Sequence, residues 1–452
     1  MNVLAEVSFT LRSHSSSVTS ICFVEIAKNR EVAENFGSKW CLATGDADGN
    51  LIVWDSEPFF DQLAHWCAHD GGILALLPDP RRGSSAPSLR FWSQGRDGCL
   101  HLWEWMIAID SSHETSLFLD DLLDSSALGK SSTNTRSSAL ALATPLPNKI
   151  STIRTGFGSF CRSDLLLWNS NDRETLFILS STVNATEIEV WEVGPLVVST
   201  SLPTCSVDPL IDNVGRFAVP LSAVSEAAAV LSKSSDGSED EAQGTLLDAM
   251  KAQTGMVMCA TFLHNQRAQS VVTHKEKSSA ELLIAVCYES GSIFILQCHT
   301  CHQEDESAKA KALITLPICK DPLLSFALFI DDSGGAAVGS GSFIYVFSLD
   351  VAEGKGAVTH RLPLAAPGSN ATLLLRFSSG RDGISFGCWD STVRCIPCDS
   401  VVEPSTARVV KLPISHRSSV NSLAAITHES SCTLASGEKD GTVLITKLLL
   451  LQ

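Results

Sequence analysis

Short runs of alternating apolar and polar residues, each broken by a tight turn, recur along most of the chain. The clearest example lies at residues 91–103, FWSQGRDGCLHLW, where an Asp-Gly turn separates two apolar runs. This arrangement predicts a two-stranded antiparallel hairpin. Related phrases occur at residues 40–55 and 432–448. A phrase that returns at intervals indicates a repeat fold built from short strands.

Seven such units can be followed, and their last strands end near residues 54, 103, 191, 296, 347, 396 and 446. Four of the six steps between these ends are close to 50 residues, which is typical of propeller blades of three or four strands. The two long steps contain Ser-rich or acidic stretches, at about 106–150 and 203–251. We predict that both are surface insertions, the first with one weak helix near 117–123. The long step at 192–296 could hold an eighth blade, but its Ser-, Asp- and Glu-rich tract lacks two clean strands, so we expect seven blades.

The two ends of the repeat are complementary. The first predicted strand, Val7–Leu11, has no hairpin partner, whereas the last unit stops after its third strand at Leu450. Pairing these two segments would close a ring and remove two exposed sheet edges. We therefore expect an all-β protein in which residues 1–452 form a single seven-bladed β-propeller.

Three of the units share a set of polar residues. Each is preceded by a His and contains a Ser or Thr followed four residues later by an Asp, and two of them also carry a Trp. Asp accepts from His and from turn amides, while the hydroxyl and the indole N–H complete the network. We predict a buried structural hydrogen-bond set in each unit: His14, Thr44, Asp48 and Trp54; His69, Ser93, Asp97 and Trp103; and His416, Ser436 and Asp440.

Two sequence patterns could indicate other kinds of chemistry. A Ser, a His and an Asp also occur together in hydrolases, but this set recurs and Ser93 lies within a strand rather than on a Gly-x-Ser-x-Gly elbow. Cys298, Cys301 and His302 match the haem-attachment pattern and half of a zinc site. No second ligand pair stands out, and nothing indicates an exported or organellar setting. We expect no catalytic residues, no metal and no cofactor.

The composition of the chain disfavours several classes of partner and location. The net charge is −17, from 50 acidic and 33 basic residues, which disfavours direct nucleic-acid binding because phosphate contacts need clustered Lys and Arg. No run of 18 apolar residues predicts a membrane span, and the N-terminus lacks the pattern of a secretory signal. The 15 Cys residues lie mostly singly in apolar runs, so we expect them to be reduced and buried.

Several phrases, taken in order, resemble the ASTRA-associated protein 1 family of WD-repeat proteins. SQGRD (Ser93–Asp97) and FCRS (Phe160–Ser163) carry most weight, because they are unusual among propellers. The other phrases are Leu102-Trp103, Gly255–Cys259, Tyr288–Ser292, Trp389-Asp390 with Val393-Arg394, and the unit from His416 to Asp440. The resemblance covers the chain except the two insertions, which look longer here. The last unit departs from the pattern, with Thr446 in place of the Trp.

The resemblance implies a non-catalytic scaffold subunit of the ASTRA complex. That assembly joins the RuvB-like ATPases, the Tel–Tti co-chaperone and a giant pseudokinase related to the phosphatidylinositol 3-kinases. The implied roles are chromatin regulation and the maturation or stability of such kinases. The implied location is the nucleus, with the cytoplasm as a second site.

Two alternatives use the same fold. The first is a substrate receptor of a cullin-type ubiquitin ligase. The second is a G-protein beta-like signalling adaptor, which is disfavoured because a strand that begins by Val7 leaves no room for an N-terminal helix. The candidate partner contacts are three charged turn residues, Arg96, Arg381 and Lys439, for which ordinary solvated charges are the alternative. The acidic tract at 234–241 could bind a basic partner or be phosphorylated.

Overall fold

The part of the chain that the structure describes consists of β-strands and the turns that join them. The computed structural model describes residues 2–27, 40–55, 60–81, 88–106, 146–155, 160–169, 174–182, 186–194, 211–217, 255–263, 281–299, 310–376, 382–397, 409–427 and 431–451. Within these stretches the protein is all-β, with no helix. They accordingly contain no helix that could cross a membrane. The predicted weak helix near 117–123 lies outside the described residues.

Five of the sheets have four antiparallel strands each. Four of these five consist of strands that are consecutive in the sequence. They are β10 (Asp164–Asn169), β11 (Glu174–Ser181), β12 (Ile188–Val193) and β13 (Ile211–Phe217); β14 (Val257–Phe262), β15 (Glu281–Tyr288), β16 (Ser292–His299) and β17 (Ala310–Pro317); β18 (Leu323–Leu328), β19 (Gly334–Gly339), β20 (Phe343–Asp350) and β21 (Lys355–Pro363); and β22 (Ser369–Leu375), β23 (Gly383–Cys388), β24 (Val393–Pro397) and β25 (Val410–Lys411).

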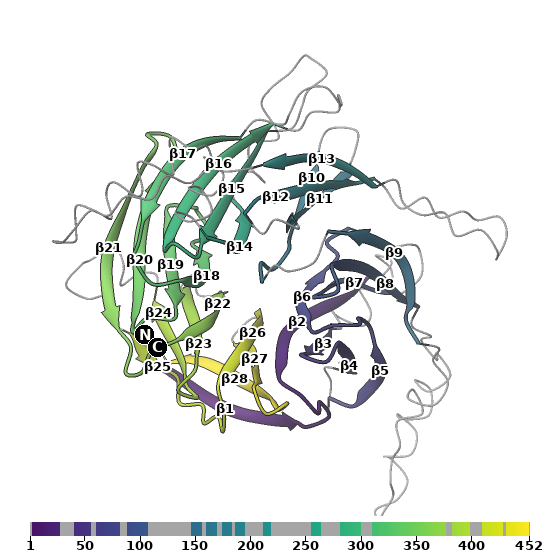
Figure 1. Cartoon of the computed structure of the whole chain (residues 1–452). Coiled ribbons are helices and arrows are strands. Elements are labelled where there is room, and N and C mark those ends of the chain that lie inside the picture. Colours follow the sequence, from purple (N-terminus) through teal and green to yellow (C-terminus); the bar gives the residue numbers. More distant parts are fainter. Residues whose placement is uncertain are drawn as a thin grey trace, which may run out of the picture.

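The fifth four-stranded sheet brings the two ends of the chain together. Its order is β1 (Asn2–Leu11), β28 (Val443–Leu451), β27 (Cys432–Glu438) and β26 (Val420–Thr427). β1 runs antiparallel to β28, with Val7 opposite Thr446 and Leu11 opposite Val443. The two termini accordingly lie next to each other in Figure 1. The first strand is longer than the predicted segment, since it begins at Asn2.

One sheet has eight strands and consists of two halves. The first half is β2 (Val18–Ala27), β3 (Trp40–Asp46), β4 (Asn50–Asp55) and β5 (Gln62–Cys67); the second is β6 (Ile73–Pro78), β7 (Ser88–Gly95), β8 (Cys99–Met106) and β9 (Asn148–Arg154). The halves are linked where β2 pairs with β7, through Ile26 with Leu89 and Ala27 with Ser88. Elsewhere they pack face to face through a shared cluster of buried apolar side chains.

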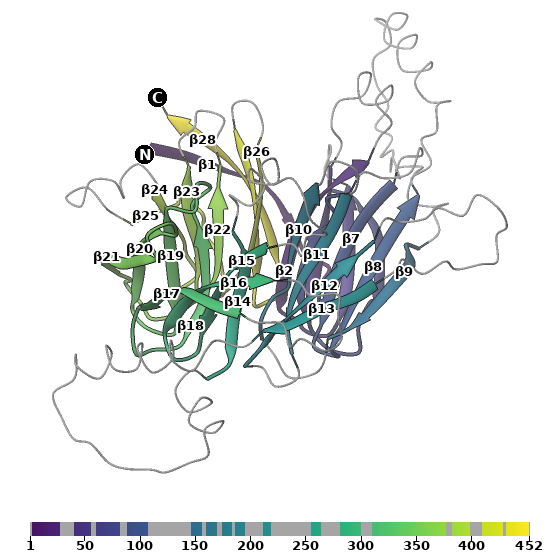
Figure 2. The ribbon, with the colours of Figure 1, turned by 90° about the horizontal axis from the view of Figure 1, so that it is seen from above.

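The sheets surround a common centre in a propeller-like arrangement (Figure 1). Most strands run between two opposite faces of the molecule (Figure 2). A cluster of buried apolar side chains lies between each sheet and the next. One of these clusters joins β7–β9 to β11 and β12 through residues such as Trp92 and Ile178. The core is thus distributed around the ring, because each sheet buries both of its faces against neighbours.

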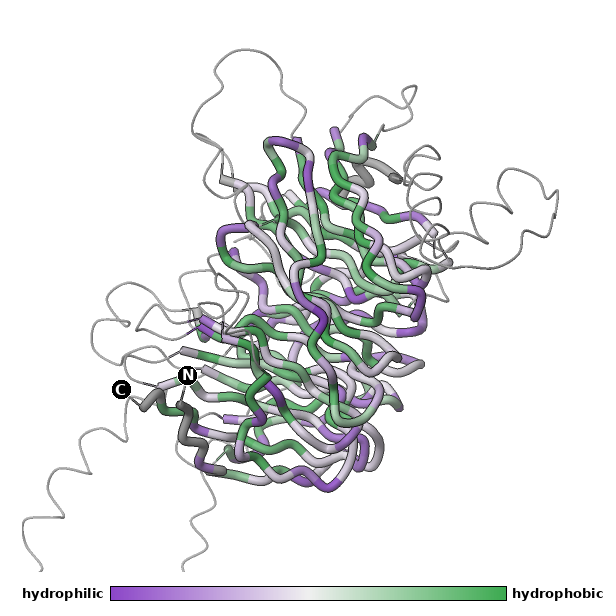
Figure 3. The backbone as a smooth tube through the Cα atoms, turned by 90° about the vertical axis from the view of Figure 1, so that its left-hand side faces the viewer, coloured by the Kyte–Doolittle hydropathy of each residue, from purple (hydrophilic) through white to green (hydrophobic). Residues whose placement is uncertain are grey.

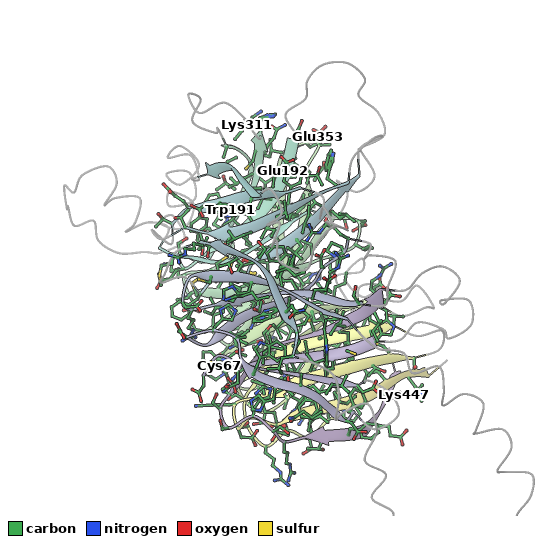
Figure 4. All side chains as sticks on the ribbon, turned by 90° about the vertical axis from the view of Figure 1, so that its right-hand side faces the viewer. Cys67, Trp191, Glu192, Lys311, Glu353 and Lys447 are labelled. Atoms are coloured by element: carbon green, nitrogen blue, oxygen red, sulfur yellow. The ribbon has the colours of Figure 1, made fainter. Side chains whose placement is uncertain are left out.

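The outermost strands differ from the inner ones in how far they are buried. β19 and β23 are buried at every position, whereas β21 is exposed or half-buried throughout. Figure 3 shows long hydrophobic stretches in the strands and hydrophilic residues at many turns. Figure 4 shows Lys311 of β17 and Glu353, which follows β20, at the outer edge of the ring. Charged residues at such edges disfavour pairing with another chain.

Two predicted boundaries were wrong. The second insertion was placed at 203–251, but Ile211–Phe217 form β13 and pair with β12. The first insertion was placed at 106–150, but Asn148 already begins β9, and Met106 still belongs to β8. In both cases the missed strand is the last of four consecutive strands, β6–β9 or β10–β13, and pairs with only one other described strand. Such a strand needs less apolar character, so its hydrophobic pattern is weak.

Candidate functional site

The first polar set forms around His14, with one correction. His14 Nδ1 lies 2.9 Å from Asp46 Oδ2, and His14 Nε2 lies 2.8 Å from Thr44 Oγ1. The Trp54 indole N–H donates to the same hydroxyl over 2.9 Å. The predicted acid, Asp48, was wrong: it is exposed at the tip of the turn, and Asp46 takes its place. Burial raises the pKa of Asp46, but hydrogen bonds from His14 and Asn50 outweigh burial and leave the pKa below its ordinary value.

The second set brings together all four residues named for it. His69 Nδ1 lies 3.0 Å from Asp97 Oδ2, and His69 Nε2 lies 2.7 Å from Ser93 Oγ. The Trp103 indole N–H donates to Ser93 Oγ over 2.8 Å. Asp97 also accepts from the backbone N–H of Cys99 and so fixes the hairpin turn. The set ties the loop before β6 to the β7–β8 hairpin.

The third set contains a second correction. His416 Nε2 lies 3.4 Å from Ser436 Oγ, and His416 Nδ1 lies 3.1 Å from Glu438 Oε1. The predicted acid, Asp440, is exposed and instead accepts from the backbone N–H of Thr442. Burial raises the pKa of Glu438, but hydrogen bonds from His416 and from the N–H groups of Ser418 and Arg417 hold the pKa below its ordinary value.

A glycine explains why the acid occupies different positions. Asp46 and Glu438 stand two residues after the hydroxyl residue, where the second unit has Gly95. A Cβ atom at Gly95 would lie 2.3 Å from His69 Nδ1 and 2.5 Å from Asp97 Oδ1. Asp97 therefore fills, from the far side of the turn, the space that an acidic side chain at position 95 would occupy. The phrase with Gly95 was the template for the predictions, so it misplaced the acid in the other two units.

The His69 set has the composition of a hydrolytic triad but lacks access. Ser93 is 0% exposed, and its hydroxyl is already bonded to His69 and Trp103. A nearby second histidine, His101, stacks on His69 with ring centroids 4.5 Å apart. Ligand atoms of His69, Asp97 and His101 lie within 4.8 Å of one another. Both His69 nitrogens are engaged in hydrogen bonds, so this cluster is accounted for by structural bonding.

A side-chain junction joins β7 to the segment that precedes β10. The Gln94 Nε2 group donates to the Cys161 carbonyl over 3.1 Å, and the Ser163 N–H donates to Gln94 Oε1 over 2.8 Å. Next to this pair, the Arg96 guanidinium lies 5.3 Å from the centroid of the Phe160 ring. The junction consists entirely of residues from the phrases SQGRD and FCRS.

The junction opens onto a central cavity of about 390 Å³. The first strand of every sheet unit, or the segment just before it, contributes to the wall. The lining residues are Ser17, Thr19, Ala47, Ile73, Leu74, Arg96, Phe160, Arg162, Met258, Cys259, Leu324, Ser325, Asn370, Trp389 and Asn421. Phe160 is 50% exposed and Trp389 is 42% exposed, which is unusual for side chains of this size.

Arg162 reaches across the cavity wall. Its Nη2 group donates to the Thr19 carbonyl over 3.3 Å and to the Asn421 carbonyl over 3.2 Å. Burial lowers the pKa of the Arg162 guanidinium from its ordinary value. Among the described residues, no carboxylate forms an ion pair with Arg162. Its partners are therefore carbonyl dipoles from β2 and β26, on other sheets of the ring.

The structure describes some of the remaining predicted residues, and the others lie outside the described part of the chain. Arg96 lies at the cavity mouth and is exposed, as is Lys439, which occupies the turn between β27 and β28. Arg381, Cys301, His302 and the acidic tract at 234–241 lie outside the described residues. Cys298 is buried in β16, and burial raises the pKa of its thiol to about 12.

The sequence did not single out Gln94, Phe160, Arg162 and Trp389 as individual site residues. All four lie within phrases that were noted as unusual or as part of the repeat, so the available signal was the phrase and not a chemical pattern. Comparison with protein-family models finds none that matches the chain.

Proposed function

We propose that the protein is a seven-bladed WD-repeat propeller. The eight-stranded sheet counts as two blades, since its halves pack face to face and pair along β2 and β7 over only two residue positions. The five four-stranded sheets complete the count. On this interpretation β1 is the outer strand of the last blade, which closes the ring. Closure leaves the outer strand of each blade as its free edge.

The proposed role is that of a non-catalytic scaffold, a subunit of the ASTRA complex. It would act in chromatin regulation and, with the Tel–Tti co-chaperone, in the maturation or stability of phosphatidylinositol 3-kinase-related kinases, in the nucleus and also in the cytoplasm. The observation that carries the proposal is the junction between SQGRD and FCRS. These two phrases carry the family resemblance, and they meet at one exposed mouth beside Gln94 and Phe160.

A scaffold role agrees with the state of the polar sets. Ser93, the residue that a hydrolase would use as nucleophile, is fully buried, and its oxygen is held by Trp103. The cavity mouth instead presents large aromatic side chains, which are enriched at protein–protein contacts. Exposed aromatic groups around a rigid opening suit the binding of another protein.

An affinity pull-down of the tagged full-length protein from native extract, analysed by mass spectrometry, tests this proposal. We expect recovery of the Tel–Tti proteins, the RuvB-like ATPases or the giant pseudokinase. A variant in which Phe160 and Trp389 are both replaced by Ala should recover less of them while its melting temperature stays close to that of the wild type. Recovery of a cullin adaptor or a G-protein gamma subunit in their place would overturn the assignment to the ASTRA complex.

A further inference from the structure

We propose that the mouth of the central cavity binds a carboxylate-bearing segment of a partner protein, and that Arg162 pairs with the carboxylate. The inference rests on the proposed scaffold function, because it names the chemistry of a partner for the same surface. It is carried by the position of Arg162 in the cavity wall and by the unpaired charge of its guanidinium.

Arg162 is held in place but not neutralised. Its two hydrogen bonds go to the carbonyl groups of Thr19 and Asn421, and no described carboxylate pairs with it. A partly buried cation that is bonded only to neutral groups has lost hydration without gaining a counter-charge. The planar guanidinium still has further N–H groups, and a carboxylate can accept two of them at once.

The rim of the cavity adds a second cation and two aromatic surfaces. Arg96 is exposed over the Phe160 ring and likewise pairs with no described carboxylate. Several carboxylates of the neighbouring turns are already engaged: Asp46 with His14, Asp97 with His69, and Asp390 with Arg394 at 2.7 Å. The mouth therefore offers unpaired positive charge in a protein whose net charge is −17. That contrast favours an acidic partner at this place.

The residues that line the cavity indicate which other chemical groups the ligand should carry. Ile73, Leu74, Met258 and Leu324 make much of it apolar. Within the apolar wall, one carboxylate would balance Arg162. A phosphate dianion would bring a second negative charge there, while the other cation, Arg96, is exposed at the rim. A volume of about 390 Å³ has room for a few side chains. The segment that fits best has an Asp or Glu beside an aliphatic or aromatic residue, which would pack on Phe160 and Trp389.

Selection from a phage-displayed library of random 12-residue peptides on the immobilised full-length protein tests the inference. We expect the enriched peptides to carry Asp or Glu next to an apolar residue. Replacing that acid by its amide should weaken binding about tenfold or more. The substitutions R162Q and R96Q should weaken binding to a similar degree. Arg376→Gln is the matched control, since Arg376 is exposed at the other end of β22 from the cavity residue Asn370.

R162Q removes two bonds across the ring, so its melting temperature must be compared with that of the wild type. If R162Q does not fold, R96Q and W389A decide the result, because both side chains are exposed. The inference is overturned if no peptides are enriched or if the enriched peptides lack acidic residues. It is also overturned if replacing the peptide's acid by its amide, or the substitution R96Q, leaves the affinity unchanged. Tighter binding of a phosphoserine peptide than of its Asp counterpart would overturn it as well. Acidic-peptide binding without recovery of ASTRA proteins in the pull-down would instead count against the proposed function alone.

Discussion

Gln94 and Ser163 are joined by a hydrogen bond that links two neighbouring sheets of the ring. The Ser163 N–H donates to Gln94 Oε1 over 2.8 Å, while the other end of the same carboxamide donates to the Cys161 carbonyl. Gln94 lies in β7, and Ser163 immediately precedes β10. Gln94 is only 3% exposed, so water cannot easily replace it. One side chain thereby bonds two backbone groups of the segment that precedes β10.

This bond predicts a stability effect for the Q94A substitution. It would remove the acceptor of the Ser163 N–H and the donor to the Cys161 carbonyl, and a buried polar group that loses its partner costs about 1–3 kcal/mol. We expect the free energy of unfolding, measured by urea denaturation, to fall by about 2–4 kcal/mol. Gln297→Ala is the control, because Gln297 lies partly exposed on β16 and bonds the exposed Glu281, so the loss should stay below about 1 kcal/mol. Equal losses for the two variants would contradict the role given to Gln94.

The corrected acid of the first set can be tested by comparing two aspartates. D46A removes the partner of His14 and the acceptor for the backbone N–H groups of Asp48 and Asn50. It should lower the free energy of unfolding by about 2–4 kcal/mol. D48A changes an exposed side chain at the turn and should change that energy by less than about 0.5 kcal/mol. The reverse order, measured by the same denaturation curves, would restore the original assignment.

The two misplaced acids show which feature of the polar sets could not be predicted from the sequence. Alternating apolar runs and turn residues were enough to find the strand units, because each hairpin is defined by neighbours in the sequence. The acid that pairs with each His depends on the side of the turn from which a carboxylate approaches. In the unit of His14, the Asp46 side chain fills the space beside the imidazole ring. In the unit of His69, Gly95 leaves that space open and Asp97 enters it. Equal spacing from the hydroxyl residue could not reveal that difference.

One strand of the fold was missed as well. β13 has the sequence IDNVGRF, with only three apolar residues among seven.

The candidate site was harder to predict than the fold. The cavity gathers residues from distant parts of the chain: the two carbonyls that hold Arg162 belong to Thr19 and Asn421. No local pattern marks such a junction. The unusual phrases containing Gln94 and Arg162 indicated importance without indicating that they meet.

Two threonines should respond in opposite directions to the same substitution. Thr44 Oγ1 is bonded to His14 and Trp54, so T44V should lower the free energy of unfolding by about 2–3 kcal/mol. Thr446 is also 0% exposed, but its hydroxyl finds no partner among the described residues. T446V keeps the shape and removes this unpaired group, so it should stabilise by up to about 1 kcal/mol. Destabilisation by T446V in thermal unfolding would show that the hydroxyl is satisfied.

The paired histidines predict how stability changes with pH. Burial first, and then the nearby His69 and Lys149, lower the pKa of His101 to about 4. Burial also lowers the pKa of His69, although Asp97 opposes the shift. An unfolded histidine titrates near 6.5, so below that pH the unfolded chain binds protons that the folded protein does not. The free energy of unfolding should therefore fall as the pH drops from 6.5 towards 4, with His101 contributing at most about 1.4 kcal/mol per pH unit.

Urea denaturation of the wild type and of H101Q at pH 7.5, 6.0 and 5.0 measures this contribution. Gln does not titrate in this range, so the decline between pH 6.0 and 5.0 should be shallower in H101Q than in the wild type. The two proteins should differ by a constant amount above pH 7, where His101 is neutral in both the folded and the unfolded state. Parallel curves down to pH 5.0 would mean that His101 takes up a proton equally in both states, and that its stack on His69 does not exclude the charged form.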